Sequence, residues 1–306
     1  MSQPIAGWRL APAGERSELK HSNFPRLPFL RKRSLNRELV SRHSLTVRIT
    51  HWVNVLCFSI LLLSGLQIFN AHPRLYWGKY GADADQAFIA VGSRKLEDGL
   101  HGFFQIGTLS IETTGVLGAS REGEAITARA FPAWLTIPSY HDLRAGRNWH
   151  FLFAWLLVIN GFVYLAHGLW RGHIRRDLSP SRDQLTLAHL RQEVLDHIRL
   201  RFPKGDDARR YNALQKLTYL AVALGLFPLM VLTGLTMAPG LNAVFPFLLD
   251  VFGGRPSART LHFISASLLV LFVVVHVLMV VLSGCWNNIR SMISGRYAIE
   301  HPGEEK

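Results

Sequence analysis

Four long apolar segments dominate the hydrophobic pattern of this 306-residue chain. They cover residues 51–69, 150–169, 217–237 and 261–282, and none of them contains Lys, Arg, Asp or Glu. A helix needs about 20 mostly apolar residues to cross a bilayer. The pattern therefore predicts four transmembrane helices, with the lipid bilayer as a direct partner of the chain.

The polar segments around these spans set the expected domain boundaries. We expect a basic tail at residues 1–44, a four-helix domain at 45–295 and a short tail at 296–306. Two long connections interrupt the domain, at 71–148 and at 170–216. The predicted fold class is an all-α membrane protein, a four-transmembrane-helix bundle in which 71–148 forms a long loop on one side.

Positive charge is distributed unequally between the two sides of the predicted bundle. Lys and Arg number ten before His51, eleven in 170–216 and three after residue 283, against eight in 71–148 and two in 238–260. Loops rich in Lys and Arg stay in the cytoplasm, so both termini are expected there and 71–148 in the periplasm. The net charge of +13 is thus a topology signal, and a nucleic-acid partner is not expected.

The cytoplasmic connection contains one amphipathic pattern. Within residues 181–201, apolar side chains recur at helical spacing, at Leu187, Leu190, Val194 and Ile198. This spacing is typical of a helix with one apolar face. We expect that helix to lie along the cytoplasmic surface of the membrane.

Histidines are the notable polar residues of the spans. They are His51, His150, His167, His262 and His276. Ionisable side chains inside a membrane usually face the bundle interior or a site. In a helix with 3.6 residues per turn, the 14 residues between His262 and His276 are about 40° short of four full turns and rise about 21 Å. One helix therefore presents two imidazoles on one face, one toward each membrane surface.

Matching depths across the bundle gives each of these two rings a partner. His150 begins a span that runs in the same direction as that of His262, so these two lie near the periplasmic side. His51 begins a span of the opposite direction and pairs with His276 near the cytoplasmic side. His167 is a rival for the cytoplasmic position, but its 17-residue offset from His150 places it about 100° away from that face.

Two imidazoles at one depth suit the two axial positions of a haem iron, so the pattern favours two haems. Structural zinc prefers closely spaced ligands in one small site, which histidines split between two depths do not provide. A proton relay is a third reading, although no span holds Asp or Glu to share that work. Histidines without any ligand are the plainest alternative.

Several residues near these histidines are candidates for a haem pocket. Arg48, Arg147 and Arg259 each precede a candidate ligand by three residues, about one helical turn toward the water, where a haem propionate would accept hydrogen bonds. They are equally suited to mark the ends of the spans. Trp52 can pack on a haem or anchor in the interface, and Gly65 can make room for a porphyrin or for a neighbouring helix.

The first and third spans contain a short repeat. "LLLSGLQI" near the end of the first span resembles "MVLTGLTM" at the end of the third, because each places a glycine after a hydroxyl residue.

Quinone binding needs a polar group beside a lipid-facing crevice near one haem. The cytoplasmic-side candidates are Asn54, His167, Gln215 and Lys216, and the periplasmic-side ones are Gln67, Asn70 and His72.

Four motifs are similar to those of the bacterial cytochrome b561 / nickel-hydrogenase cytochrome b superfamily. They are "RITHWVNVLCFSILLLSG", "RNWHFLFAWLLVINGFVY", "RRYNALQKLTY" and "HFISASLLVLFVVVHV". The resemblance covers about residues 42–295. The last three motifs are most similar to the branch of thiosulfate-reductase-like cytochrome b subunits.

The resemblance implies a multi-pass protein of the bacterial inner membrane with two b-type haems. Its ligand pattern falls on His51, His150, His262 and His276. Such proteins pass electrons between the quinone pool and a periplasmic oxidoreductase, which would dock here on 71–148. The motif "HPRLYWGKYG" in that connection is similar to branch members paired with a molybdenum subunit.

The resulting hypothesis is an electron-transfer subunit with no catalytic residues of its own. A first rival is a stand-alone quinol-oxidising cytochrome that acts on a small oxidant such as superoxide. A second is a haem-free transporter or metal-binding membrane protein. A partner subunit would distinguish the first rival, and a haem spectrum the second.

Overall fold

The structure is a computed structural model that describes residues 36–81, 85–172, 179–199, 201 and 212–301. Residues 37–301 form one compact unit. Most of the predicted basic tail, residues 1–35, lies outside the described residues, as do residues 302–306 of the predicted C-terminal tail.

All four predicted membrane spans are present as long apolar helices. They are α1 (Leu45–Phe69), α2 (Leu143–Trp170), a third span composed of α4 (Ala213–Leu220), η6 (Ala221–Leu226) and α5 (Phe227–Met237), and α8 (Arg255–Leu282). Each begins several residues before its apolar window because polar residues form the first turn. The caps agree with this, since Ser44 and Asp142 each accept a hydrogen bond from a backbone N–H of the first turn.

The third span contains a wide π-helical turn, η6, between its two α-helical parts. Pro228 follows directly, near the start of α5. Proline has no N–H, and its ring clashes with the carbonyl of the residue four positions earlier, which here is Leu224 within η6. The wider turn accommodates that clash, so the irregularity has a local cause in the sequence.

Shorter elements complete the helical part. They are η2 (Ala133–Leu135), η4 (Asp183–Leu185), α3 (Leu187–Ile198), α6 (Pro239–Val244), α7 (Phe247–Val251) and α9 (Cys285–Ser294). Of the predicted amphipathic segment, residues 187–198 are helical. The strands β1 (Asn36–Ser41) and β8 (Arg296–His301) form a two-stranded sheet.

The connection between α1 and α2 is largely β-structure, which the all-α expectation missed. It contains β2 (Arg74–Leu75), β3 (Ile89–Leu96), β4 (Gly99–Ile106), β5 (Leu109–Glu112), β6 (Gly118–Glu122) and β7 (Ala125–Arg129). Strands β2 to β5 form an antiparallel sheet in sequence order, and β6 pairs with β7. We call residues 74–129 the β module.

Tight turns explain why this segment folds as hairpins. Two-residue loops at 97–98, 107–108 and 123–124 join paired strands. Gly107 and Gly123 have positive φ, as hairpin turns of this length favour. Regularly spaced Gly turns between short strands were therefore the signal for β-structure that the length and polarity of 71–148 concealed.

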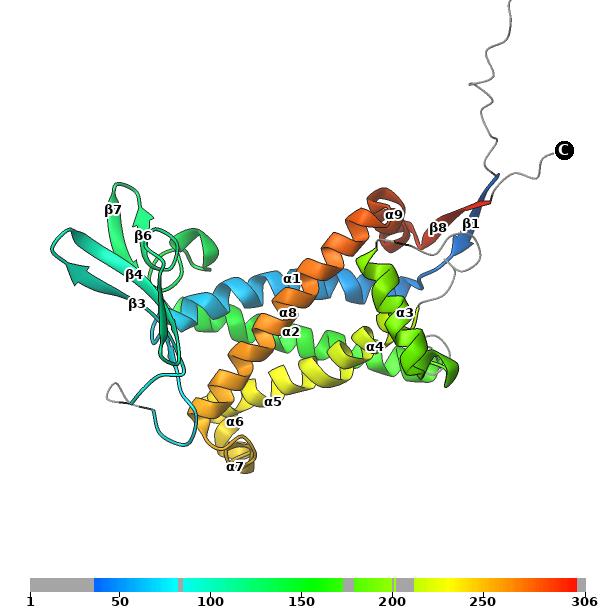
Figure 1. The fold of residues 1–306 in the computed structure, drawn as a ribbon. Helices are drawn as coiled ribbons and strands as arrows, with labels where there is room; N and C mark the ends of the chain where they lie inside the picture. Colours follow the sequence, from blue (N-terminus) through cyan, green and yellow to red (C-terminus); the bar gives the residue numbers. More distant parts are fainter. Residues whose placement is uncertain (1–35, 82–84, 173–178, 200, 202–211, 302–306) are drawn as a thin grey trace, which may run out of the picture. The chain divides into compact units, whose positions relative to one another are not determined.

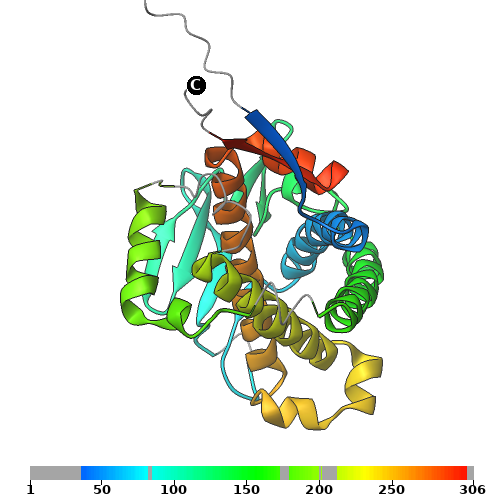
Figure 2. The same cartoon turned by 90° about the vertical axis from the view of Figure 1, so that its right-hand side faces the viewer.

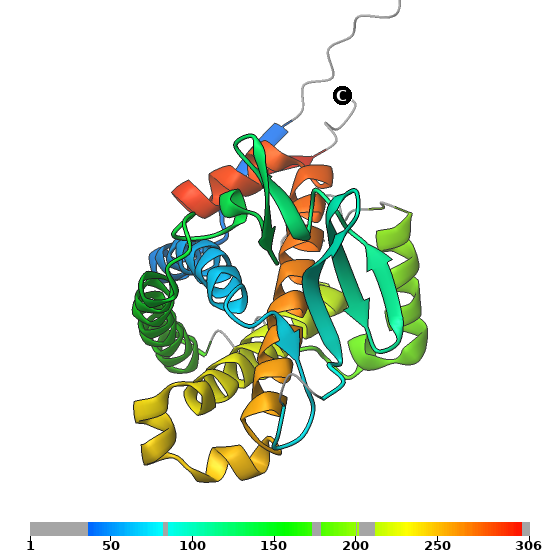
Figure 3. The same ribbon diagram turned by 90° about the vertical axis from the view of Figure 1, so that its left-hand side faces the viewer.

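The β module packs against one end of the helices, and α9 lies at the other end (Figure 1). Figure 2 shows α1 and α2 side by side, and Figure 3 shows the β module from its own side. A shared apolar core joins the module to the bundle. Its buried members include Phe69 of α1, Leu75 of β2 and Val91 of β3, with Phe263 of α8 packed against them.

A buried arginine ties the β module to the helix ends. The Arg129 guanidinium, on β7, donates to the Gln67 side-chain oxygen at 2.7 Å and to the Thr136 hydroxyl at 2.7 Å. The Gln67 amide in turn donates to the Tyr140 carbonyl at 2.9 Å. The hydrogen bonds of its Nη groups offset part of the cost of burying this arginine, which is 3% exposed.

The start of α8 forms a second junction with the module. Thr260 donates to the Tyr76 carbonyl at 2.7 Å, and Ser257 accepts from the Gly78 N–H at 2.7 Å. At Gly254 a Cβ atom would lie 2.6 Å from the Cα of Lys79, so only glycine permits this approach. The β module is thus fixed to the same helix that carries His262.

An exposed ionic cluster joins the β3–β4 turn to β5. His101 contacts the Asp98 carboxylate at 2.9 Å and the Glu112 carboxylate at 2.8 Å. The hydrogen bond to Glu112 is the main reason that the pKa of His101 is raised, and the bond to Asp98 adds to it. The same hydrogen bond from His101 lowers the pKa of Glu112. The folded module therefore favours protonated His101 beside ionised carboxylates.

We predict a pH-dependent contribution of this cluster to the stability of the β module. A raised histidine pKa stabilises the fold fully below the ordinary value of about 6.5, and this stabilisation is lost as the pH rises through the folded-state pKa. His101→Gln should therefore increase amide exchange of residues 97–112 at about pH 5.5 and have little effect at about pH 8.5. The measurement is the ratio of exchange rates, variant to parent, at each pH.

His141→Gln is the matched control for this experiment. His141 is an exposed histidine of the same connection, and no change in the ratio is expected. A ratio for His101→Gln that does not vary with pH would contradict the prediction.

Candidate functional site

The structure brings four of the five membrane histidines together in two pairs. The rings of His150 on α2 and His262 on α8 have centroids 6.3 Å apart and planes at 59°. Those of His51 on α1 and His276 on α8 have centroids 6.3 Å apart and planes at 60°. These are the two pairings expected from depth. We call the first the module-end pair and the second the α9-end pair.

The spacing in both pairs fits two imidazoles on opposite sides of one metal ion. A metal–imidazole bond is about 2 Å long, and a ring nitrogen lies about 1 Å from the ring centre, so two such rings have centroids about 6 Å apart. Each pair supplies two ligands only. Such a site suits a metal that brings its other ligands with it, as haem iron does within its porphyrin.

A conventional metal site is not found in the part of the chain that the structure describes. Among those residues, no group of three or more His, Cys, Asp or Glu side chains could hold a metal ion. Tetrahedral zinc needs four ligands in a structural site and three in a catalytic one. The two pairs thus favour haem over zinc as the metal centre.

Hydroxyl groups on facing helices orient both rings of the module-end pair. The Ser64 Oγ on α1 lies 3.1 Å from His150 Nδ1, and the Thr233 Oγ1 on α5 lies 3.0 Å from His262 Nδ1. Both hydroxyls are fully buried. Each also donates its proton to the backbone carbonyl four residues earlier in its own helix, at 2.6 Å in both cases.

These contacts determine which ring nitrogen carries the proton. A hydroxyl has one proton to donate. Here it is donated to the carbonyl, so the hydroxyl oxygen accepts a hydrogen bond from Nδ1–H. With Nδ1 protonated, Nε2 keeps its lone pair for a metal.

The glycine after each hydroxyl faces the same imidazole as that hydroxyl. A Cβ at Gly65 would lie 3.4 Å from Cε1 of His150, and one at Gly234 would lie 3.5 Å from Cε1 of His262. A Cβ at either position would be in ordinary van der Waals contact with the ring, so both glycines border an imidazole directly. The "SG" and "TG" echo in the sequence thus corresponds to one arrangement used twice, between α1 and α2 and between α5 and α8.

The α9-end pair has different surroundings. His51 lies edge-on to Trp52, with centroids 5.5 Å apart, and His276 stacks on Phe272 at 5.8 Å. Within the described residues, neither imidazole has a side-chain hydrogen bond. Aromatic packing therefore replaces the hydroxyl support of the module-end pair, and the two sites are chemically unlike.

The three candidate arginines occupy different positions. Arg48 donates to the Ile293 carbonyl, and its neighbour Trp52 donates through Nε1 to the Met292 carbonyl at 3.2 Å. Both thus bind the C-terminal end of α9, where a cation is favourable. Arg259 donates to the His72 carbonyl, and the Arg147 guanidinium lies 6.0 Å from the Phe151 ring centroid.

The candidate quinone residues have separate hydrogen-bond partners. Asn54 accepts a hydrogen bond from the Asn160 amide at 2.7 Å, at the α1–α2 interface. His167 lies at the far end of α2, with Nε2 3.4 Å from the Ser44 hydroxyl. With Trp170 and Arg171 it lines an open pocket of about 300 Å³.

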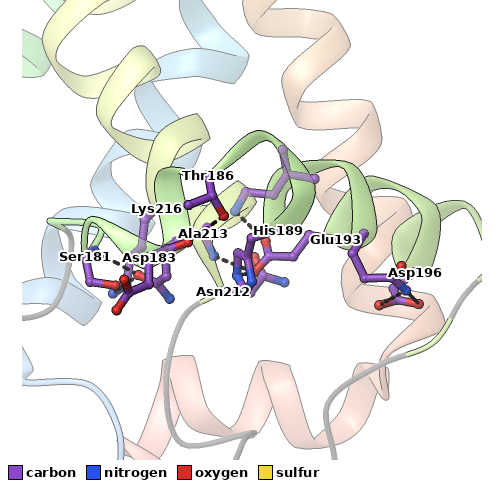
Figure 4. Close-up of polar contacts among 12 residues, drawn as sticks. Ser181, Asp183, Thr186, His189, Glu193, Asp196, Asn212, Ala213 and Lys216 are labelled. Atoms are coloured by element: carbon purple, nitrogen blue, oxygen red, sulfur yellow. Dashed lines mark hydrogen bonds and ion pairs between the residues drawn. The ribbon is translucent and has the colours of Figure 1, made fainter.

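Lys216 lies at the junction of α3 and α4 (Figure 4), and Gln215 precedes it in the first turn of α4. The Glu193 carboxylate on α3 accepts from the backbone N–H of Ala213 at 3.0 Å and of Leu214 at 2.8 Å. It thereby caps the start of α4, where a negative charge is favourable. Lys216 donates to the Gln184 side chain at 3.2 Å. Among the described residues, no hydrogen bond joins any two of Asn54, His167, Gln215 and Lys216.

Sequence reasoning missed the polar residues that support the site. Ser64 and Thr233 were visible only as the hydroxyls of the repeated motif. Asn160, which is 7% exposed and also donates to the Thr50 carbonyl at 2.8 Å, could have been found as a lone amide in the middle of an apolar span.

Four membrane-spanning helices with two pairs of facing imidazoles define a membrane cytochrome b. The chain belongs to the prokaryotic cytochrome b561 family, whose sequence model matches residues 42–295. Membership implies b-type haem and a role in electron transport across or along the membrane. The family assignment made from the four motifs is thereby confirmed.

One curated relative is described as a subunit of an enzyme. The chain is 28% identical over 248 residues to the putative protein-methionine-sulfoxide reductase subunit YedZ1 of Azospira oryzae. The alignment covers 81% of this chain and 94% of that protein. No solved structure matches the chain.

The contacts of Arg48 lead to a prediction about α9. Arg48→Met removes a charge-assisted hydrogen bond, worth roughly 1.5–3 kcal/mol, from the C-terminal carbonyls of α9. Amide exchange of residues 291–295 should rise roughly tenfold or more. Hydrogen exchange followed by mass spectrometry would measure this.

Arg147→Met serves as the control, because the Arg147 guanidinium lies beside Phe151 on α2, and the substitution should leave the exchange of α9 unchanged. If Arg48→Met shifts a haem potential and leaves the exchange of α9 untouched, Arg48 is a propionate partner and the prediction is wrong.

Proposed function

We propose that this chain is a dihaem cytochrome b that transfers electrons between the quinone pool and a periplasmic oxidoreductase. The observation that carries the proposal is the shared geometry of the two imidazole pairs, at 6.3 Å and about 60° in each. Bound haem would supply one-electron chemistry at each pair. His150 and His262 would hold one haem, and His51 and His276 the other.

The residues around the pairs would orient and insulate these sites. Ser64 and Thr233 hold the module-end rings in the tautomer that leaves Nε2 free. At the α9 end, the aromatic rings of Trp52 and Phe272 pack against His51 and His276. Since α8 carries one histidine of each pair, the two sites lie 14 residues apart along one helix, and α8 connects the two sides of the membrane.

For the topology we propose an inner-membrane protein with both termini in the cytoplasm. The excess of Lys and Arg before α1 and in 170–216 supports this orientation. The β module then faces the periplasm, and the α9 end faces the cytoplasm. Exposed apolar side chains on α3, at Leu187, Val194 and Ile198, are consistent with a helix lying on the inner membrane surface.

The quinone site is proposed at the α9 end. The pocket beside His167 is open there, and the family likeness favours the cytoplasmic side. His167, Asn54, Gln215 and Lys216 are the candidates to donate or accept the protons that accompany quinone oxidation. We choose His167 first among them because it lines that pocket.

The partner is proposed to be a molybdenum-type oxidoreductase that docks on the β module. A folded module in place of a loop supports docking, as does the description of YedZ1 as a reductase subunit. By likeness to that relative, electrons would run from quinol to the partner. The edge strand β5 offers the exposed apolar side chains Leu109 and Ile111, which a partner could cover.

Haem content tests the proposed ligand pairs. The purified parent should carry two b-type haems per chain, seen in a reduced-minus-oxidised absorption spectrum. His150→Ala and His262→Ala should each retain one haem with the same spectrum and potential. His51→Ala and His276→Ala should each retain the other. A double variant within one pair should lose no more haem than either single variant.

His167→Ala is the matched control, as a fifth membrane histidine outside both pairs, and it should keep two haems. A folded parent without haem would sink the proposal and favour a transporter. Loss of a haem in His167→Ala, with both kept in His51→Ala, would make His167 the ligand instead.

Association with a partner tests the second half of the proposal. The chain purified gently from its own membranes should bring stoichiometric molybdenum with it. Quinol-reduced haem in that complex should be reoxidised by methionine sulfoxide. Replacing both Leu109 and Ile111 by Lys should lower the molybdenum content per haem at least several-fold, as expected for apolar residues at the centre of an interface.

Glu124→Lys, at the exposed β6–β7 turn, controls for added positive charge and should keep the molybdenum. Full activity toward superoxide by the chain alone, with no molybdenum in any preparation, would instead support the stand-alone cytochrome.

A further inference from the structure

We infer that Ser64 and Thr233 are positioning residues that make the electronic properties of the two haem sites unequal. This inference rests on the proposed function, since it concerns residues that would act on the axial ligands. It starts from a contrast already described. Both imidazoles of the module-end pair contact a buried hydroxyl through Nδ1, and neither imidazole of the α9-end pair does within the described residues.

The geometry is the same at both hydroxyls, which argues against a chance contact. The distances from oxygen to Nδ1 are 3.1 and 3.0 Å, and those from oxygen to the carbonyl four residues back are 2.6 Å in both helices. A glycine follows each hydroxyl and faces the same imidazole. Two separate helix pairs, α1 with α2 and α5 with α8, thus build one arrangement.

The chemical consequence follows from the direction of the hydrogen bonds. Each hydroxyl donates its hydrogen bond to a carbonyl. Toward the imidazole it therefore acts only as an acceptor, and it accepts a hydrogen bond from Nδ1–H. An acceptor at the outer nitrogen raises the basicity of the ligating nitrogen. A more basic ligand stabilises the oxidised metal. The two hydroxyls should therefore keep the reduction potential of the module-end site lower than the same two imidazoles would give without them.

Redox titration of hydroxyl-free variants tests this inference. Ser64→Ala and Thr233→Val remove one acceptor each with little change in volume. Both are best measured in the His51→Ala background, in which the module-end haem is the one retained. At the parent's midpoint potential, the ratio of reduced to oxidised haem should rise roughly threefold to tenfold for each lost hydrogen bond, and further in the double variant.

Matched controls exist on α1 and α8, the helices that carry Ser64 and His262. Ser59 of α1 and Ser267 of α8 are exposed, and each donates to the carbonyl four residues earlier at 2.9 Å without touching a histidine. Ser59→Ala and Ser267→Ala should leave the potential unchanged. Ser64→Thr and Thr233→Ser keep a hydroxyl and should keep the parental potential as well.

The possible outcomes separate this inference from the proposed function. A parent without two haems defeats the proposed function. Two haems with parental potentials in both hydroxyl-free variants overturn the role of Ser64 and Thr233 alone. If Ser64→Ala loses its haem, Ser64→Thr decides: retention at the parental potential supports the hydroxyl, and a shifted potential contradicts it.

Discussion

The placement of four partly buried imidazoles in an apolar bundle is the constraint around which this protein is organised. A polar ring in hydrocarbon is costly unless it finds partners. The structure meets that cost by bringing the rings together in two inclined pairs, one toward each end of α8, and by giving the module-end rings hydroxyl partners. Helix direction, small residues and buried hydroxyls all follow from this requirement.

The bundle can be understood as two helix pairs with a common plan. In each pair the first helix provides a hydroxyl followed by glycine, and the second provides a histidine. The glycine borders the same imidazole that the hydroxyl contacts through Nδ1. The plan is broken at the α9 end, where α1 and α8 provide the histidines and aromatic rings contact them. The two histidine pairs therefore share a geometry and differ in their surroundings.

The β module is more than a covering for one end of the bundle. Hydrogen bonds of Thr260 and Ser257 join it to the first turns of α8. Thr260 lies two residues before His262. A second junction, through Arg129 and Gln67, joins it to the end of α1. A partner bound to the module would thus be connected, through these two junctions, to α1 and α8. Of these helices, α8 carries His262 of the module-end pair.

The lengths of the four apolar segments by themselves determined the membrane spans, because a helix needs about 20 apolar residues to cross a bilayer whatever the fold. Helical geometry also determined that His262 and His276 share a face, and depth then paired them with His150 and His51. Flanking charge did not determine the role of Arg48, since the same residue can cap a helix or bind a propionate, and only the position of α9 showed which carbonyls it meets.

Tertiary structure alone decided the features that depend on distant residues. The β module packs against helix ends that are far from it in the sequence, and the polar pattern of 71–148 is a weak signal even for its hairpins. The roles of Ser64, Thr233 and Asn160 depend on which helix lies opposite each of them, and no local pattern contains that information. The chain thus encodes its spans and the positions of its paired histidines locally, whereas the contacts that support those histidines arise only when the helices pack.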